Sequence, residues 1–331
     1  MSVLIVIPAL NESRHIAEVL SVGQAVTGTE NLVVVADGGS TDATRDIVGS
    51  RTRDVPWVRL LDNPDRIQSA GINLAVATFG NGHEYLIRLD AHAGYPEGYV
   101  QALLATAADT GATAVVVPMK AVAETCFQSA VAAAQNSRLG TGGAAHRMAT
   151  ASGWVDHGHH ALIRMDAFRA VGGYNAALVT NEDAELDTRL LANGGRIWLS
   201  AENEIAYYPR GSSAALWKQY FRYGIGRATT LRLHGTRPKL RQRIPILILP
   251  LVAMGLLGPI VPMALVPALA WATLCLGYGL ALGIRSRNLC AAAAGWPAMI
   301  MHLAWSCGYW HSQLQALAAG RARATGPGRD A

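Results

Sequence analysis

The clearest indication of the fold lies in residues 3–44, VLIVIPALNESRHIAEVLSVGQAVTGTENLVVVADGGSTDAT. The runs at 3–7 and 32–36 are continuously apolar, which is typical of strands buried on both faces of a parallel sheet. A helical pattern from about Glu12 to Val26 separates them, so the stretch predicts a β-α-β unit. Further strands are predicted at 57–61, 85–89 and 113–117. With helical segments between them, these strands indicate an α/β fold with a mostly parallel sheet.

Polar side chains follow three of these strands, at the sheet edge where α/β proteins bind their ligands. The segments PALNES, DGGSTDAT and DAHAGYP carry the candidates Asn11, Glu12, Asp37, Ser40, Asp42 and Asp90. Such groups can accept hydrogen bonds from a base or a ribose, or hold a divalent cation. Each turn alone could be an Asx turn or a helix cap. Three acidic turns at one edge favour a ligand site, and the lack of G-x-G-x-x-G weakens a dinucleotide interpretation.

Asp90 and His92 stand two residues apart at the end of a strand, so both side chains could reach one metal ion. A carboxylate with an imidazole suits Mn²⁺ or Mg²⁺ that is bound mainly through substrate phosphates. The alternative is a surface turn with a capping aspartate.

Residues 180–195, TNEDAELDTRLLANGG, predict a helix that ends at one of the two glycines. On a helical wheel Asp183 falls on the apolar stripe of Leu186 and Leu190, with Asp187 close beside it. A carboxylate on that inward stripe can serve chemistry. It can also form a capping box with Thr180.

Glu185 and Arg189 point away from that stripe, at the spacing of an exposed ion pair. Glu185 is therefore predicted to be a solvated surface charge.

The segment VDHGHHALIR contains His157, His159 and His160. Neighbouring residues of a strand point to opposite faces, which disfavours a zinc site. Contacts with an acceptor or ordinary packing are expected instead.

Two C-terminal regions are apolar enough for a membrane. Residues 244–283 carry almost no charge over about twice the ~20 residues that span a bilayer, and Gly258 with Pro259 offers a break. They predict a pair of transmembrane helices. A third segment, 289–310, could also span, with a re-entrant or interfacial segment as the alternative. A buried hydrophobic core is the other interpretation of these regions.

The basic residues that flank these segments predict the topology. They are Arg237, Lys239, Arg241, Arg243, Arg285 and Arg287. The positive-inside rule then places the N-terminal domain in the cytoplasm, on a multi-pass protein of the inner (plasma) membrane. If the third segment spans, a tail with Arg321, Arg323 and Arg329 would lie outside, against the rule. The expected domains are 1–235 (catalytic), 236–243 (basic linker), 244–312 (membrane) and 313–331 (tail).

Net charge and cysteine usage further narrow the class of protein and its cellular compartment. The formal net charge of +5 owes much to the membrane flanks, which suit an anionic membrane better than nucleic acid. The start of the chain is not typical of a signal peptide, because its apolar run is short and has no basic region before it. The four scattered cysteines indicate neither a zinc site nor a disulfide framework, which fits a reducing compartment.

Taken in order, the motifs resemble those of the inverting family-2 glycosyltransferases, which have the A-type nucleotide-sugar-binding fold. The motifs are VIPALNES, VVVADGGSTDAT, NPDRIQSAGINLA, RLDAHAGYP, GGYN, NEDAEL and QYFRYGIGR. The resemblance covers about residues 2–235. With its C-terminal apolar segments the chain is similar to membrane-attached glucosyltransferases of exopolysaccharide assembly.

The resemblance implies roles for matching positions. Asp183 matches the catalytic base, and Glu182 would support the acceptor or the cap. The implied donor-binding residues are Pro8, Asn11, Glu12, Asp37, Ser40, Arg66 and Asp90, the metal ligands are Asp90 and His92, and the diphosphate or acceptor residues are Gln219, Arg222 and Tyr223. Two departures stand out, because His92 replaces the usual final Asp of the metal motif and Gly38 replaces the usual second Asp of the nucleotide turn.

The expected function is transfer of a sugar, glucose from a UDP-sugar, to a lipid-linked (polyprenyl diphosphate) saccharide in exopolysaccharide or cell-surface glycan biosynthesis. Displacing a nucleoside diphosphate needs charge neutralisation by a metal and arginine, and a base near the attacking hydroxyl. The expected cofactor is therefore Mn²⁺ or Mg²⁺, with no nucleic-acid partner. One alternative is a polyprenyl-phosphate sugar synthase. Another is a catalytically silent, membrane-anchored sugar-nucleotide sensor or scaffold.

Overall fold

The computed structural model describes residues 1–24, 31–143, 147 and 151–324. It divides into two compact units, of which the first comprises Met1–Val122 and Ala144–Tyr208. The second comprises Ala123–Gly143 and Pro209–Ala331. The division between the units thus falls before the expected domain limit at residue 235.

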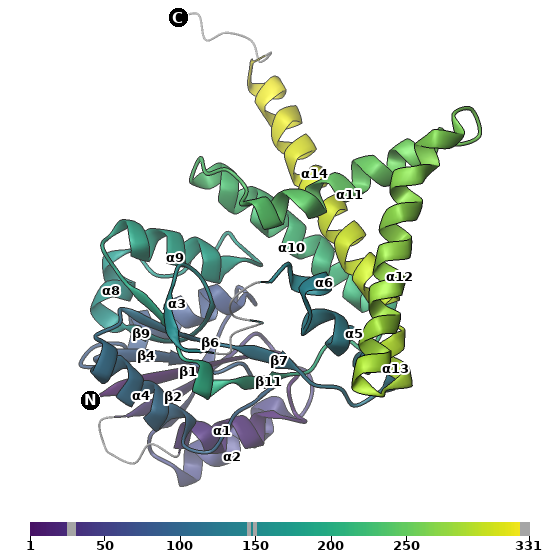
Figure 1. The fold of residues 1–331 in the computed structure, drawn as a ribbon. Helices are drawn as coiled ribbons and strands as arrows, with labels where there is room; N and C mark the ends of the chain where they lie inside the picture. The colour runs from purple at the N-terminus through teal and green to yellow at the C-terminus, as the bar shows by residue number, and fades with distance from the viewer. Residues whose placement is uncertain (25–30, 144–146, 148–150, 325–331) are drawn as a thin grey trace, which may run out of the picture. The chain divides into compact units, whose positions relative to one another are not determined.

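An eight-stranded sheet forms the centre of the first unit, in the order β3-β2-β1-β4-β9-β6-β10-β8 (Figure 1). Its strands are β1 (Val3–Ala9), β2 (Leu32–Asp37), β3 (Val58–Asp62), β4 (Tyr85–Arg88), β6 (Ala114–Val117), β8 (Gly153–Val155), β9 (His159–Arg164) and β10 (Ile197–Leu199). All five strands predicted from the sequence are present, and β1 to β4 run parallel to one another. The sheet is nevertheless mixed, because β9 pairs antiparallel with both β4 and β6 and β8 pairs antiparallel with β10.

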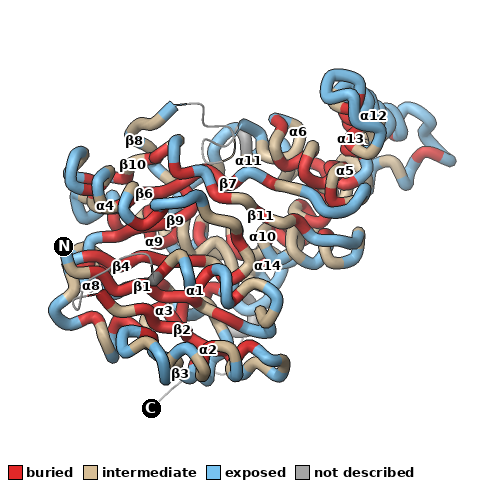
Figure 2. Tube along the Cα trace, turned by 90° about the horizontal axis from the view of Figure 1, so that it is seen from below, coloured by how far each residue is buried: buried red, intermediate tan, exposed pale blue. Residues whose placement is uncertain are grey.

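Helices cover both faces of this sheet (Figure 1). They are α1 (Ile16–Gln24), α2 (Thr44–Asp54), α3 (Gln68–Phe79), α4 (Tyr99–Thr110), α8 (Met165–Ala170) and α9 (Glu182–Ala192). Ile72 of α3, Phe168 of α8 and Leu186 of α9 share one core with Leu4 and Val6 of β1. The alternate residues of β1 are also buried, so the central strands lie inside on both faces, as their continuous apolar runs predicted (Figure 2).

A second, three-stranded sheet has the order β5-β11-β7. Its strands are β5 (Ala93–Gly94), β7 (Met119–Ala121) and β11 (Ile205–Tyr207), and the short helix η1 (Ala201–Asn203) precedes β11. β5 lies immediately after the turn that carries Asp90 and His92. Pairing with β11 therefore ties down the end of that turn.

The second unit is helical. Its elements are α5 (Cys126–Gln135), α6 (Arg138–Thr141), α10 (Ser213–Leu233), α11 (Leu240–Gly255), η2 (Pro262–Leu265), α12 (Val266–Ser286), α13 (Leu289–Ala292) and α14 (Gly295–Ala324). α10 and α14 approach closely at Gly224 and Gly308, where a Cβ atom would collide with the carbonyl oxygen of Trp305 or Phe221. Only glycine permits that backbone approach.

The third apolar segment belongs mainly to α14, which packs inside this unit. Ala298 and Met301 are buried in a core with α5 and α10. Pro250 lacks an N–H, so the carbonyl oxygen of Ile246 in α11 has no partner within its own helix. It accepts hydrogen bonds from Trp310 Nε1 (2.9 Å) and Ser306 Oγ (3.1 Å). One face of the third segment is thus used for contacts between helices.

Within the described ranges, one helix is long and apolar enough to cross a membrane, Pro262–Ser286. Only 11% of the most apolar window of this helix is buried. The apolar helix before it, Gln242–Gly255, is shorter. The predicted break near Gly258 is present between these two helices. The membrane pair remains a prediction, and residues 325–331 of the predicted tail lie outside the described part of the chain.

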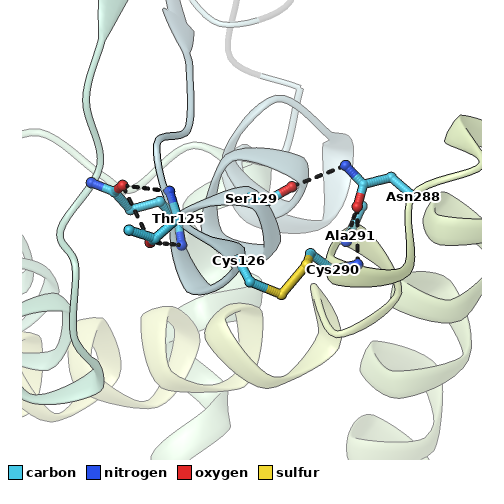
Figure 3. Close-up of a disulfide and its surroundings, with 7 residues drawn as sticks. Thr125, Cys126, Ser129, Asn288, Cys290 and Ala291 are labelled. Atoms are coloured by element: carbon cyan, nitrogen blue, oxygen red, sulfur yellow. Dashed lines mark hydrogen bonds between the residues drawn. A yellow bond between two sulfur atoms is a disulfide. The ribbon is translucent and has the colours of Figure 1, made fainter.

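Cys126 and Cys290 form a disulfide, 164 residues apart in sequence (Figure 3). The prediction that the cysteines form no disulfide was therefore wrong for this pair. Each cysteine lies in the first turn of a helix, α5 or α13, and Asn288 Nδ2 donates to Ser129 Oγ beside them (3.1 Å). Helix packing creates this proximity, and sequence spacing does not reveal it. Cys275 and Cys307 are free thiols.

Candidate active site

Three strand ends meet at one edge of the large sheet, as the sequence predicted. β1, β2 and β4 are neighbours, and their turns follow at that edge. The first two turns are joined by hydrogen bonds: Asn11 N donates to Ser40 Oγ (2.8 Å), Thr41 N to Asn11 Oδ1 (2.8 Å) and Glu12 N to Thr44 Oγ1 (2.8 Å). The polar residues thus build a rigid edge as well as offering groups to a ligand.

Asp37 serves this edge from inside. It is fully buried and accepts hydrogen bonds from the backbone of Gly39 and Ser40 and from Arg45 Nη1 (2.7 Å). Burial would raise the pKa of Asp37, but these hydrogen bonds outweigh it and lower the pKa. Arg66, with a left-handed φ of 57°, places its guanidinium beside Gly39. Little of the Asp37 carboxylate is therefore open to a nucleotide.

Asp42 forms an Asx turn, which is the simpler of the two interpretations of its segment. Its carboxylate accepts from Thr44 N (3.0 Å), from Thr44 Oγ1 and from Ser13 N (3.1 Å). It fixes the start of α2 against the first turn. Pro8 is part of β1, where it is registered with Ala36 of β2.

Arg88, the last residue of β4, is a buried cation among three carboxylates. Its Nε donates to Asp90 Oδ1 (2.9 Å), its Nη1 donates to Asp183 Oδ1 (2.7 Å), and Nη1 lies 3.6 Å from Glu182 Oε1. Burial alone would lower the pKa of Arg88, but Asp183 and Asp90 outweigh it and raise the pKa well above its usual value. Arg88 therefore joins the predicted metal motif to the predicted base.

The pKa values of the two acids at the start of α9 shift in opposite directions. Burial would raise the pKa of Asp183, but Arg88 and then His160 hold it well below its usual value. Burial and then the neighbouring Asp183 raise the pKa of Glu182 to about 7. At neutral pH Asp183 is therefore ionised, whereas Glu182 carries a proton for part of the time.

Asp183 does not form the capping box that the sequence allowed. Asn181 occupies the N-cap position with a left-handed φ of 68°, and the Asp183 carboxylate points to Arg88. The predicted end of the helix is confirmed, since Gly194 has a φ of 79° and Gly195 N donates to Leu190 O (2.8 Å).

The predicted exposure of Glu185 was wrong. Its side chain is 4% exposed and pairs with Arg189, whose Nη1 also donates to Gly173 O (2.7 Å). The loop before α9 folds over this face of the helix and needs a donor for its carbonyl groups. The helical wheel does not show that loop.

His159 and His160 both contact Asp183, although strand alternation predicted opposite directions. His159 Nδ1 lies 3.5 Å from Asp183 Oδ2, and His160 Nδ1 lies 3.3 Å from Asp183 Oδ1. A β-bulge accounts for the direction of His160: Val115 pairs with Leu162 and Val116 with His160, so Ala161 is the extra residue and the alternation shifts there. A bulge redirects the side chains next to it.

The remaining histidine contacts extend in two directions. His159 Nε2 lies 3.3 Å from Asp90 Oδ2. Asp187 is buried between His157 Nδ1 (2.8 Å) and His160 Nε2 (2.7 Å). The cluster is therefore a carboxylate–imidazole network, and its histidines act mainly as partners of aspartates.

As far as the described residues go, Asp90 and His92 would need ligands from outside the chain to hold a divalent cation. Among the described residues, no group of three or more His, Cys, Asp or Glu side chains is arranged for a metal ion. Asp90 Oδ1 accepts from Gln68 Nε2 (3.0 Å), and His92 Nδ1 lies 3.0 Å from Glu12 Oε1. A carboxylate and an imidazole at this spacing fit Mn²⁺ or Mg²⁺ when phosphate oxygens complete the shell.

Gln219, Arg222 and Tyr223 lie on α10 of the second unit. Gln219 Nε2 donates to Tyr223 Oη (3.0 Å), one helical turn further on. The predicted role of these three residues toward the diphosphate or the acceptor remains a prediction.

Sequence reasoning missed Arg88 and the function of His160. A signal for Arg88 was present, because a charged residue ends an otherwise apolar strand and shares a strand face with Asp90, two positions later. His160 gave no comparable signal, since the bulge that orients it depends on pairing with β6.

The fold and its acidic edge define a glycosyltransferase with the A-type fold. The chain belongs to glycosyl transferase family 2, whose family model matches residues 4–172. It is 48% identical to the succinoglycan biosynthesis protein ExoA of Rhizobium meliloti (strain 1021). The similarity extends over 314 residues and covers 95% of each chain.

One of the similar solved structures supports the fold. The mannosyltransferase PcManGT from Pyrobaculum calidifontis, in complex with GDP-Man and Mn²⁺, is similar with a TM-score of 0.58 at 19% identity, over 95% of this chain and 87% of that one. S. aureus TarS gives a TM-score of 0.46 at 17% identity over 68% of this chain, which spans 39% of TarS.

Proposed function

We propose that this glycosyltransferase moves glucose from UDP-glucose to a hydroxyl group of a lipid-linked saccharide, with inversion at the anomeric carbon. The observation that carries the proposal is the grouping of Asp183, Glu182 and Asp90 around Arg88 at the carboxyl edge of the sheet. Similarity to a succinoglycan biosynthesis protein supports a role in exopolysaccharide assembly.

In the proposed reaction the acceptor oxygen bonds to C1 of the donor sugar while the bond from C1 to the phosphate oxygen breaks. The hydroxyl proton goes to Asp183, which Arg88 and His160 keep ionised in the protein. Glu182, with a pKa of about 7, can donate a hydrogen bond to the acceptor in its protonated form. The nucleoside diphosphate then leaves with the electron pair of the broken bond.

The departing diphosphate carries negative charge that the site must stabilise. A divalent cation held by Asp90 and His92 would neutralise part of that charge. The Mn²⁺ and GDP-Man in the similar mannosyltransferase structure support a divalent cation and a nucleotide sugar in general terms. The proposed nucleotide contacts are Pro8, Asn11, Glu12, Ser40 and Arg66, with buried Asp37 holding their turn from inside. The proposed diphosphate or acceptor contacts are Gln219, Arg222 and Tyr223.

We also propose that α11 and α12 lie in the cell membrane, with the catalytic unit in the cytoplasm. Leu256, Ile260 and Leu274 are 72–83% exposed, which is typical of side chains that contact lipid. A polyprenyl-linked acceptor would be presented at the same membrane. Sedimentation of the protein with liposomes after high-salt and carbonate washes would test this placement.

The test of function uses the full-length protein with native lipid extract and a panel of UDP- and GDP-sugars. The expected result is consumption of UDP-glucose and a lipid-linked saccharide heavier by one hexose, as seen by mass spectrometry. Asp90→Ala serves as the inactive control.

Other results would replace the proposal. Glucosylated polyprenyl phosphate would identify a polyprenyl-phosphate sugar synthase. Donor binding without any turnover, in the presence of lipid and metal, would identify a sugar-nucleotide sensor or scaffold.

A further inference from the structure

We infer that His160, held by Asp187 from behind, is a positioning residue that orients Asp183 for proton transfer. The inference rests on the proposed role of Asp183 as the base. The side chain of His160 is fully buried and cannot contact the acceptor saccharide. It would therefore act only through the carboxylate of Asp183 beside it.

One side of the His160 ring is fixed by Asp187. Nε2 lies 2.7 Å from Asp187 Oδ1, and both side chains are at most 1% exposed. Asp187 is in turn held by His157 Nδ1 (2.8 Å) and by the backbone N–H of Gly158 (3.3 Å). A Cβ at Gly158 would collide with Val116, so glycine allows the backbone to reach this carboxylate.

The other side of the ring faces the proposed base. Nδ1 lies 3.3 Å from Asp183 Oδ1 and 2.8 Å from Tyr174 Oη. Burial would lower the pKa of His160, but Tyr174, Asp187 and Asp183 outweigh it and raise the pKa well above its usual value. The ring is therefore a cation whose Nε2–H is directed at Asp187, while Nδ1 meets Tyr174 Oη and lies within ion-pair distance of Asp183.

This arrangement determines which lone pairs of Asp183 remain available. Oδ1 accepts from Arg88 (2.7 Å) and lies 3.3 Å from His160 Nδ1, whereas the contact of Oδ2 among the described residues is the longer one with His159 (3.5 Å). Asp183 and Asp187 are one helical turn apart on α9, so a single imidazole can bridge them. Such support behind a reacting carboxylate holds it near the geometry that transfer requires.

A purely structural role must be distinguished from positioning, because a buried His–Asp pair also stabilises the fold. Two substitutions separate them. In His160→Gln the amide nitrogen can reach Asp187 as Nε2 does, but residue 160 then has no contact with Asp183, which keeps Arg88 and His159. In His160→Asn the amide can reach Asp183 as Nδ1 does, but Asp187 loses its contact with residue 160 and keeps only those with His157 and Gly158.

The measurement is turnover and donor KM for both variants, together with their melting temperatures. We expect His160→Gln to lose roughly 10²-fold in kcat with an unchanged donor KM, because a base displaced by about 1 Å costs that much. His160→Asn should keep at least tenfold more turnover than His160→Gln while melting at a lower temperature. Ile163→Val on the same strand is the control for lost stability, and its kcat should match the wild type.

Asp187→Asn keeps the shape of the site in case both histidine variants fail to fold. It removes the charge that keeps His160 doubly protonated, so kcat should fall although Asp187 does not touch Asp183. Wild-type turnover in Asp187→Asn or His160→Gln would overturn the inference, as would turnover that simply follows melting temperature. If the wild type transfers no sugar, the proposed function itself fails, and this inference fails with it.

Discussion

At the scale of single residues, Asp183 is the most direct test of the chemistry. Asp183→Asn keeps the size of the side chain but cannot take a proton, so turnover should fall by about 10²- to 10⁴-fold. Donor affinity, measured by calorimetry, should stay within about twofold, since Asp183 is not among the proposed donor contacts.

The control is Asp166→Asn, which removes a 65%-exposed aspartate in a surface ion pair. It should have little effect on turnover. Near-normal turnover in a folded Asp183→Asn protein would show that Asp183 has a structural role and is not the base. It would also favour a phosphate nucleophile, which needs no strong base.

Arg88 should matter for stability as well as activity. Arg88→Met leaves Asp90 and Asp183 without their shared cation, and breaking such a buried pair costs about 3–5 kcal/mol. Arg88→Lys keeps the charge but cannot donate in two fixed directions, so it should fold better and still lose turnover. Urea unfolding measures the stability of both variants, and the sugar-transfer assay measures their turnover. Arg164→Met is the surface control. Equal stability of Arg88→Met and the wild type would contradict the central role of this residue.

Glu182 predicts a pH dependence of stability. Its pKa is about 7 in the folded protein and about 4.5 in the unfolded chain, so the folded state binds more protons between these values. Stability from this group is complete below pH 4.5 and is lost as the pH rises through 7. The loss is roughly 3 kcal/mol, since one pKa unit is worth about 1.4 kcal/mol. Glu182→Gln should reduce this slope in melting curves recorded at pH 5 to 8, to which the raised pKa values of His159 and His160 also contribute, and an unchanged slope would refute the assignment.

At the scale of elements, the link between α5 and α13 can be tested chemically. With Cys126 and Cys290 bonded, the denatured but unreduced protein should show two reactive thiols, Cys275 and Cys307, and four after reduction. Cys126→Ser should lower stability by about 2–4 kcal/mol, because the bond closes a long loop. Four thiols before reduction would show that the pair is not bonded in the purified protein. Cys307→Ser is the matched control.

Helix α9 shows how one element acquires several tasks. Its first turn supplies Asp183 and Glu182, its next turn supplies Asp187, and the opposite side holds Glu185. The periodicity predicted the inward stripe correctly. It could not show that the loop with Gly173 and strand β9 enclose the remaining faces.

At the scale of the whole molecule, transfer should depend on a divalent cation. EDTA should abolish activity, and Mn²⁺ or Mg²⁺ should restore it, whereas Asp90→Ala should not be rescued. His92→Asp should stay active and shift its preference toward Mg²⁺, because a harder ligand replaces the imidazole. The new carboxylate would face Glu12, so this variant should melt lower without metal and recover when metal is added. Full activity in EDTA would refute the metal site.

The sequence by itself determined five strands of the large sheet, the edge at which they end, and polar residues in the turns at that edge. Continuous apolar runs report burial on both faces, and polar residues after them report the ligand-binding side, so Asp37, Asp90 and their turns were found without a structure. Ordered motifs then gave the family. These are local signals, and each lies within one element and the turn after it.

Only the tertiary structure decided how these residues are paired. Arg88 and Asp183 are 95 residues apart, and Cys126 and Cys290 are 164 apart, so neither pair follows from periodicity. His160 reaches Asp183 because a bulge against β6 shifts the strand alternation. Periodicity tells which side of an element faces inward, whereas the partner on that side depends on how other elements pack against it.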